Sequence, residues 1–390
     1  MILIKNANLI SMAETNYKKT DILTDGSKIL KIGKLNILDY PNAEIIDVNG
    51  KTVTPGIVDP HCHVGLFEEA IGFEGSDGNE MTSPVTPEMR GIDAVKPQDT
   101  AFLDALKSGV TTVCTGPGSA NVIGGTFCIL KTVGKTIDDM VLVKESSMKM
   151  ALGENPKRVY NSKSQTPQTR MASAALIREA LIKARDYSEK LKKYETDLVA
   201  GKEVTKPEFN MKWASLSRVF DGFPVKIHAH QQDDIVTAIR IIEEFGLNAT
   251  IEHATEGYLI PEYLKLHHQR VIIGPTLGSK SKYELRNKTF CAGKVLKENG
   301  VDFAIMTDHP VIHLENTLTQ VGLFVKAGLD ELDALKAVTI DAARMNQIDH
   351  LVGSIEIGKD ADIVIWSGHP LHYLTHPEVV IVNGEVVFKA

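Results

Sequence analysis

The middle of this 390-residue chain alternates short apolar runs with segments whose apolar residues recur at helical spacing. The run Val225–His228, for example, precedes Asp233–Phe245, in which apolar side chains return every three or four residues. This order predicts parallel strands joined by crossover helices. The other predicted helix and strand pairs are Asp99–Lys107 with Val110–Cys114, Ala249–His253 with Pro261–His268, Val271–Pro275 with Lys282–Glu298, and Asp302–Met306 with Leu314–Ala327.

A repeat of about three hundred residues favours a closed (β/α)₈ TIM barrel over an open sheet, and therefore an α/β fold. One stretch interrupts the repeat. Thr166-Pro167 has the residues of a helix N-cap and first turn, and it is predicted to start a long polar-faced helix through about Lys193. We interpret the stretch of about residues 166–208 as an insertion between the fourth and fifth barrel strands.

The two ends of the chain carry short alternating runs separated by turn dipeptides. Asp25-Gly26 and Asn49-Gly50 separate such runs near the N-terminus, and Asn383-Gly384 does so near the C-terminus. Neither end alone has enough strands to bury a core. We therefore expect residues 1–55 and 352–390 to form one small β-sandwich domain, beside a barrel domain of residues 56–351.

Charge and composition exclude several classes of partner. The net charge is −7 and there is no long block of Lys or Arg, so a nucleic-acid partner is not expected. No apolar stretch reaches the length of a membrane span, and the N-terminal run is too short and polar for a signal segment. The four cysteines lack paired spacing, which is typical of reduced thiols in a cytoplasmic protein. A small-molecule substrate is expected, and a homo-oligomer is left open.

Histidines and one aspartate stand where predicted strands end. His61 and His63 follow the apolar run Val53–Val58, and residues two apart in a strand point to the same side, so both imidazoles can reach one metal ion. Other predicted strands end in His228 and His230, in His253, and in Asp308. The C-terminal strand ends of a barrel converge on one face. The pattern therefore predicts a metal site there.

The order of these motifs resembles that of the amidohydrolase superfamily, in particular its imidazolonepropionase-like branch. Pro55-Gly56 and the His61/His63 pair match the family's opening motif, and Gly353–Gly358 resembles the chain's return to the small β domain. The resemblance implies that His228, or His230 in its place, and His253 are metal ligands on the fifth and sixth strands. It also implies that Asp308 is the catalytic aspartate of the eighth strand.

The fourth strand offers two candidate ligands. Two-metal members of the family use a carboxylated lysine there, and others use a glutamate. Lys149 lies within the predicted strand, whereas Glu154 lies at its C-terminal mouth. A carboxylate binds zinc without further chemistry, so Glu154 is preferred and Lys149 is the alternative.

Four residues near the predicted strand ends are candidate substrate contacts. Arg158 and Tyr160 follow Glu154 and offer groups that hold a carboxylate or carbonyl. His230 lies one step beyond His228, and His309 follows Asp308. The glycine-rich stretch Gly116–Thr126 lacks the spacing and the lysine of a phosphate-binding loop.

The resemblance and the ligand set predict a metal-dependent amidohydrolase with one or two divalent ions, zinc first among them. A water activated by the metal would cleave a C–N bond of a cyclic amide, or deaminate an amidine. One alternative is a dipeptidase or N-acyl amino acid hydrolase using the same site. An alternative of another class is a non-catalytic binding protein on the barrel scaffold. The substrate and the identity of the metal are not determined by the sequence.

Overall fold

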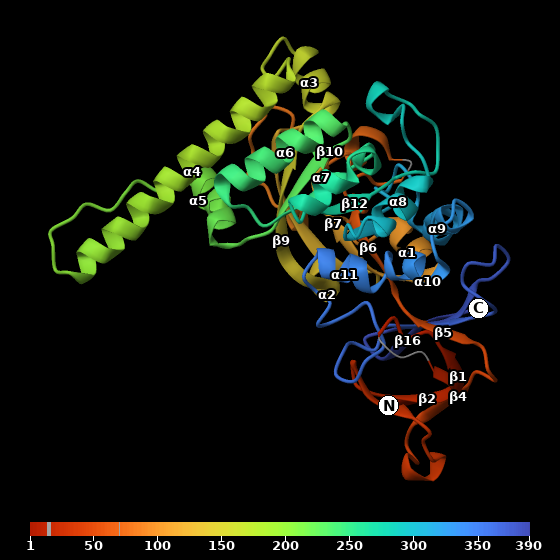
Figure 1. The fold of residues 1–390 in the computed structure, drawn as a ribbon. Coiled ribbons are helices and arrows are strands. Elements are labelled where there is room, and N and C mark those ends of the chain that lie inside the picture. The colour runs from red at the N-terminus through yellow and green to blue at the C-terminus, as the bar shows by residue number, and fades with distance from the viewer. Residues whose placement is uncertain (14–16, 70) are drawn as a thin grey trace.

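The computed structural model of the chain describes residues 1–13, 17–69 and 71–390. At its centre, eight strands form a nearly closed barrel sheet in chain order (Figure 1). Backbone hydrogen bonds from His63 N to His309 O (2.9 Å) and from Asp308 N to His61 O (3.2 Å) join the end of the first strand to the segment after the last. The strands are β6 (Ile57–Cys62), β7 (Val110–Thr115), β8 (Ile123–Lys131), β9 (Val141–Ala151), β10 (Val225–Ala229), β11 (Ala249–His253), β12 (Arg270–Ile273) and β13 (Phe303–Ile305).

The third barrel strand departs from the predicted repeat. β8 pairs antiparallel with both β7 and β9, whereas the other neighbouring strands pair in parallel. Only residues 116–122 separate β7 from β8. A parallel crossover needs a dozen or more residues, so a connection this short can only reverse the chain. The prediction of eight identical strand–helix units is corrected at this position, and part of the glycine-rich stretch belongs to β8.

Helices cover the outside of the barrel (Figure 1). Two predicted helices begin later than expected. The predicted helix Lys282–Glu298 is helical only from Cys291, because residues before it form a loop with one short turn, Tyr283–Leu285. The inserted helix begins at Arg170, where the Thr169 side chain accepts a hydrogen bond from Ala172 N. The helices are α1 (Thr100–Lys107), α2 (Ile137–Met140), α3 (Glu154–Asn161), α4 (Arg170–Val199), α5 (Met211–Ser217), α6 (Gln232–Phe245), α7 (Pro261–Leu266), α8 (Cys291–Glu298), α9 (Thr317–Lys326), α10 (Glu331–Lys336) and α11 (Ile340–Met345).

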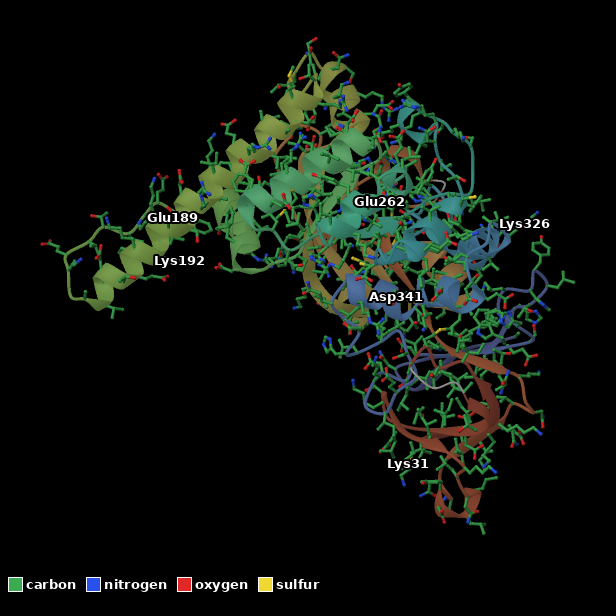
Figure 2. The ribbon with its side chains drawn as sticks, viewed as in Figure 1. Lys31, Glu189, Lys192, Glu262, Lys326 and Asp341 are labelled. Carbon is green, nitrogen blue, oxygen red and sulfur yellow. The ribbon has the colours of Figure 1, made fainter. Side chains whose placement is uncertain are left out.

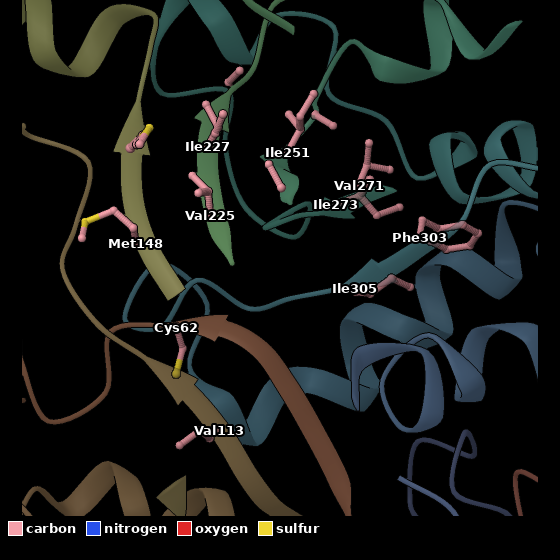
Figure 3. Close-up of a cluster of buried hydrophobic side chains, with 14 of the residues drawn as sticks. Cys62, Val113, Met148, Val225, Ile227, Ile251, Val271, Ile273, Phe303 and Ile305 are labelled. Atoms are coloured by element: carbon pink, nitrogen blue, oxygen red, sulfur yellow. The ribbon is translucent and has the colours of Figure 1, made fainter. Parts of the chain in front are cut away.

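Alternating side chains of the barrel strands form the largest apolar cluster (Figure 3). Val225 and Ile227 of β10, for example, alternate with Lys226 and His228, which point to the other side of the strand. Because a strand alternates in this way, the residues that pack against the helices leave the intervening polar residues facing the barrel interior. This alternation puts the predicted ligands inside the barrel.

The segment between the fourth and fifth barrel strands contains α4, within the predicted insertion of about residues 166–208, and also α3 and α5, which lie outside those bounds. The buried residues of α4 lie between Ser173 and Tyr187, and beyond that point the helix projects from the body (Figure 1). Figure 2 shows Glu189 and Lys192 on this projecting half. We call residues 188–209 the arm.

Strands from both ends of the chain pair into one mixed sheet. β5 joins the two sets, because it pairs with β1 on one side and with β14 on the other. The pairing confirms a sheet composed from both termini, but all eight strands belong to one sheet, and the predicted two-layered sandwich is not confirmed. The strands are β1 (Ile2–Leu9), β2 (Tyr17–Asp25), β3 (Lys28–Gly33), β4 (Glu44–Asp47), β5 (Thr52–Pro55), β14 (Ile363–Trp366), β15 (Pro377–Val382) and β16 (Glu385–Lys389).

Within the described ranges, no helix combines the length and the apolar character needed to cross a bilayer.

Candidate active site

Two groups of potential metal ligands lie inside the barrel mouth. Within each group, one ligand atom of every residue lies within 4.8 Å of the others, and all the residues are buried. We call His61, His63 and Asp308 group 1, and we call His228, His230 and His253 group 2. The groups are adjacent, since the rings of His61 and His253 are 5.8 Å apart between centroids. Six residues singled out in the sequence are thus brought together.

Hydrogen bonds fix which ring nitrogen faces the site in four of the five histidines. Nδ1 of His63 lies 2.7 Å from Gly116 O, and Nδ1 of His253 lies 2.8 Å from Gly274 O. A carbonyl oxygen only accepts, so Nδ1 carries the proton in both rings and Nε2 keeps a lone pair for a ligand. Nδ1 of His61 and of His230 also has a partner, the Glu252 carboxylate and the Thr255 hydroxyl.

The backbone at the site is strained. His253 has φ 72°, Ala254 has φ 41° and Asp308 has φ 55°, all in the left-handed region. Non-glycine residues in sparsely populated regions cost about 1–3 kcal/mol each and cluster at functional sites. The surrounding structure therefore holds the side chains of His253 and Asp308 in directions that the extended backbone of an ordinary strand end would not give.

Burial keeps four of the five site histidines neutral. It lowers the pKa of His61, His228 and His230 well below the ordinary value, and that of His253 to about 4. Burial acts in the opposite sense on Asp308, but His253 and His63 outweigh it and hold the pKa of this carboxyl below its usual value. Neutral imidazoles beside an ionised carboxylate are the protonation states that metal binding requires.

Lys149, and not the side chain of Glu154, contacts the ligand groups. Lys149 is fully buried in β9, and its Nζ lies 3.0 Å from His61 Nε2. Burial lowers the pKa of Lys149 to about 8. Glu154 is the first residue of α3 and belongs to neither group, and its contact with the site runs through its backbone N–H, which donates to Glu284 Oε2 (3.0 Å). The geometry favours Lys149 as the fourth-strand group.

Glu252 contacts the His61 ring of group 1, and the sequence analysis did not predict this contact. Its Oε2 lies 2.6 Å from His61 Nδ1, and both side chains are fully buried. Lys226 Nζ lies 3.6 Å from the same oxygen and balances its charge. The signal for Glu252 was a charged residue within the apolar strand Ala249–His253, but its partner on another strand could not be identified without the fold.

Asp59 holds the two ends of the barrel sheet together. Its carboxylate accepts hydrogen bonds from His61 N and, through the other oxygen, from Thr307 N and Thr307 Oγ1. Burial raises the pKa of Asp59 to about 7. These bonds position the strand ends that carry His61 and Asp308.

Glu284 lies beside group 2 and was also missed. It comes from the loop before α8, in the segment that was predicted to be helical. Its Oε1 is 3.4 Å from His230 Nε2, 3.9 Å from His228 Nε2 and 2.6 Å from Lys282 Nζ. Burial opposes ionisation of this carboxyl, but His230 and Lys282 outweigh it and lower its pKa.

A cavity of about 480 Å³ opens above both groups. Arg158 and His230, two of the predicted substrate contacts, line this cavity with the ligands His63, His228, His253 and Asp308. Tyr160 is buried and donates a hydrogen bond to Asn121 Oδ1 (2.6 Å), so its hydroxyl is already used within the protein. His309 is buried next to His313 and is not part of the cavity lining.

Both groups fit a divalent ion. Bonds of about 2.1 Å in a tetrahedral site put ligand atoms about 3.4 Å apart. In group 1, Asp308 Oδ1 lies 3.2 Å from His63 Nε2 and 3.7 Å from His61 Nε2. In group 2, the buried Nε2 atoms of His228 and His230 have no hydrogen-bond partner in the described part of the chain. A cation would satisfy these atoms, whose burial without a partner is otherwise costly.

Known proteins resemble the chain over nearly its whole length. A solved amidohydrolase structure from Thermotoga maritima MSB8 is 42% identical, with a TM-score of 0.94 and full coverage of both chains. An imidazolonepropionase from Geobacillus sp. is 26% identical over 89% of this chain and 84% of its own length. Amidohydrolase tasK of Hapsidospora irregularis is 30% identical over 94% of this chain, which spans only 40% of that protein's length.

A family model gives the assignment directly. The model of the amidohydrolase family matches residues 52–388, which include both ligand groups, Lys149 and the terminal-sheet strands β5, β14 and β15. The resemblance inferred from the strand-end motifs is thereby confirmed. The chain belongs to the amidohydrolase family.

Proposed function

We propose that this chain is a metal-dependent hydrolase that cleaves a C–N bond of a cyclic amide, or deaminates an amidine, at the barrel mouth. The observation that carries the proposal is the pair of adjacent, buried ligand groups beneath one cavity. Membership of the amidohydrolase family supports the reaction class. Imidazole and carboxylate ligands favour zinc, although they also accept manganese, iron or nickel.

The ligands are proposed to be His61, His63 and Asp308 for one ion and His228 and His253 for a second. Lys149 contacts group 1 directly through His61. We propose Lys149, in place of Glu154, as the fourth-strand group, which would hold metal once its amine is carboxylated, as in two-metal members of the family. Bound ions of this kind polarise a carbonyl and lower the pKa of water to about 7.

Asp308 is proposed to move the proton. Its ionised carboxylate would accept the proton of the attacking water and donate it to the leaving nitrogen. His230 faces the same cavity and would contact the substrate, and Arg158 would hold a substrate carboxylate at the mouth. His309 and Tyr160 are proposed to support this wall, since neither lies where it would touch a ligand in the cavity as the structure stands.

A second candidate is a dipeptidase or N-acyl amino acid hydrolase. Arg158 favours it, because this exposed cation at the cavity wall suits a substrate that carries a carboxylate. The two candidates share the metal site and differ in the substrate.

Elemental analysis of the purified protein, followed by a substrate screen, tests the function. We expect bound divalent metal and hydrolysis of members of one panel: cyclic ureas and hydantoins, amidine-containing heterocycles, or N-acyl amino acids and dipeptides. Protein that binds no metal after reconstitution, and turns over no panel, would instead be a non-catalytic binding protein on this scaffold.

The division into domains is part of the same proposal. Residues 1–55 and 352–390 are proposed to form one β domain, with residues 56–351 as the catalytic barrel. The shared sheet of both termini supports this division. A cytoplasmic location is also proposed, supported by the free thiols of Cys62, Cys114 and Cys128 in the core.

A further inference from the structure

We propose that His228, His230, His253 and Glu284 form a complete metal site of their own, which binds a divalent cation such as zinc without any contribution from Lys149. This inference rests on the proposed function, because the ion is one of the two proposed there. It changes how that ion is held: both fifth-strand histidines are ligands, and the fourth ligand is a carboxylate from the loop before α8.

Three imidazoles already surround one point. The ring centroids of His228 and His253 are 4.2 Å apart, those of His230 and His253 are 4.4 Å apart, and those of His228 and His230 are 4.6 Å apart. The Nδ1 contacts of His230 with Thr255 and of His253 with Gly274 direct Nε2 of both rings to the same place. Two histidines suffice for a shared two-metal site, so a third one here needs its own explanation.

Glu284 lies beside the group of three histidines, although outside the 4.8 Å limit that joins them, and we assign it as the fourth ligand. Its Oε1 lies 3.4 Å from His230 Nε2 and 3.9 Å from His228 Nε2, close to the edge of about 3.4 Å expected for a tetrahedral zinc site. The carboxylate is held in place at its other end, where Oε2 accepts the Glu154 N–H. Three histidines and one carboxylate fill the four positions that zinc takes in proteins.

The Glu284 carboxylate already has one cation beside it, the ammonium group of Lys282. Its Nζ lies 2.6 Å from Glu284 Oε1, the same oxygen that faces the histidines. Lys282 also donates a hydrogen bond to Asn155 Oδ1 (3.1 Å), so it has a second partner when it leaves the carboxylate. An incoming ion would displace the ammonium group, and Lys282 therefore competes with the metal.

Lys149 contacts group 1 through His61, so its removal should affect the two ions differently. The Lys149→Met variant of the full-length protein is prepared metal-free by chelation and titrated with zinc by calorimetry. Because this variant still keeps three ligands in group 1, His63→Asn is added to the same background to disable that group. We expect the resulting Lys149→Met, His63→Asn background to retain about one zinc per chain, held by the four proposed ligands. A cobalt-loaded sample should show the absorption spectrum of a tetrahedral site.

Two further variants test the fourth ligand. In the Lys149→Met, His63→Asn background, Glu284→Gln should weaken zinc binding by at least the 10–100-fold typical of losing a supporting partner. Lys282→Met should tighten it, because the competing cation is gone. Glu256→Gln is the matched control: the carboxylate of this buried glutamate accepts hydrogen bonds from Gln232 N and Asn287 Nδ2. Only its backbone contacts group 2, through Glu256 N–H and His230 O, and the substitution keeps that contact, so zinc affinity should not change.

The outcomes separate the inference from the proposed function. Wild-type protein that binds no metal would contradict both. If wild-type protein binds zinc but the Lys149→Met, His63→Asn background binds none, or if Glu284→Gln behaves like Glu256→Gln, the separate site is wrong while the hydrolase remains. Should Lys149→Met melt at a lower temperature than the wild type, His63→Asn alone serves instead, because it disables group 1 and leaves every group 2 residue in place.

Discussion

Asp308 joins two properties at one residue. Its carboxylate contacts His63 (3.2 Å), and its backbone has a left-handed φ of 55°. A turn residue could have this conformation for structural reasons alone, since Asp tolerates it better than most residues. The contact with His63 supports the proposed catalytic role over a purely structural one.

Asp308→Asn should therefore reduce activity by about 10²–10⁴, the usual value of general acid–base catalysis. The amide keeps the size and one acceptor oxygen but cannot take up the proton. His61, His63 and Lys149 remain, so metal content should stay near the wild-type level under excess zinc. Activity and metal content are measured on the same preparation. A metal-replete variant with nearly full activity would exclude the proton-transfer role, and recovery of activity on adding metal would make Asp308 a ligand only.

Glu252 acts on the site through another residue. We expect Glu252→Gln to weaken metal binding at group 1 by about 10–100-fold, because the carboxylate that orients the His61 ring is lost. Nitrogen-15 NMR of the histidine rings should show an altered signal for His61 Nδ1. Glu256→Gln, which removes another buried carboxylate, should change neither quantity. If both variants lose metal equally, the effect of Glu252 is on folding and not on position.

The residues of the two candidate ligand groups were predictable from the sequence. The carboxylates that contact those residues were not. His61, His63, His228, His253 and Asp308 stand at strand ends, a position that one-dimensional patterns reveal. Glu252 and Glu284 have meaning only through partners on other strands. The preference for Glu154 came from its place at the mouth of the strand, but β9 ends at Ala151, and Glu154 begins α3 and belongs to neither ligand group.

At the scale of elements, two predictions were wrong because of loops: the helix expected before Cys291 and the direction of the third barrel strand. The segment before α8 has helical periodicity, but it carries Lys282 and Glu284 to the site, where Glu284 contacts group 2 and Lys282 pairs with Glu284. The connection before β8 is too short for a helix, and its length could have revealed the reversed strand. Periodicity reports how side chains are distributed and says little about strand direction.

The arm makes few interactions with the barrel. The buried residues of α4 end at Tyr187, and the ion pair of Lys192 with Asp221 is exposed on both sides. Exposed pairs contribute about 0–1 kcal/mol. Replacing residues 190–207 with a short Gly/Ser linker should therefore leave the melting temperature, metal content and activity close to those of the full chain. A large fall in melting temperature would show that the arm stabilises the fold, and a change in oligomeric state at unchanged stability would make it an assembly element.

At the scale of the whole molecule, a buried ion network joins the barrel to the terminal sheet. Lys131, the last residue of β8, lies 2.9 Å from Asp360 and 2.5 Å from Asp362, with all three side chains almost fully buried. Lys28 of β3 lies 2.7 Å from Asp360 on the outer side. The sequence indicated that both termini share one sheet, but nothing in it identified Lys131 as the cation between that sheet and the barrel.

Lys131→Met should lower the free energy of unfolding by about 3–5 kcal/mol, because removing one partner of a buried pair leaves uncompensated charge. Two carboxylates would then share a site from which water is excluded, with Lys28 able to reach only one of them. Lys28→Met is the matched control: its side chain is 46% exposed, so its loss should cost at most about 1 kcal/mol. Adding Asp362→Asn to Lys131→Met should recover part of the loss, since one stranded charge is removed while the amide oxygen still accepts the Asn383 N–H. Urea unfolding of the four proteins measures these differences. Equal midpoints for Lys131→Met and Lys28→Met would mean that apolar packing, and not this ion network, holds the terminal sheet against the barrel.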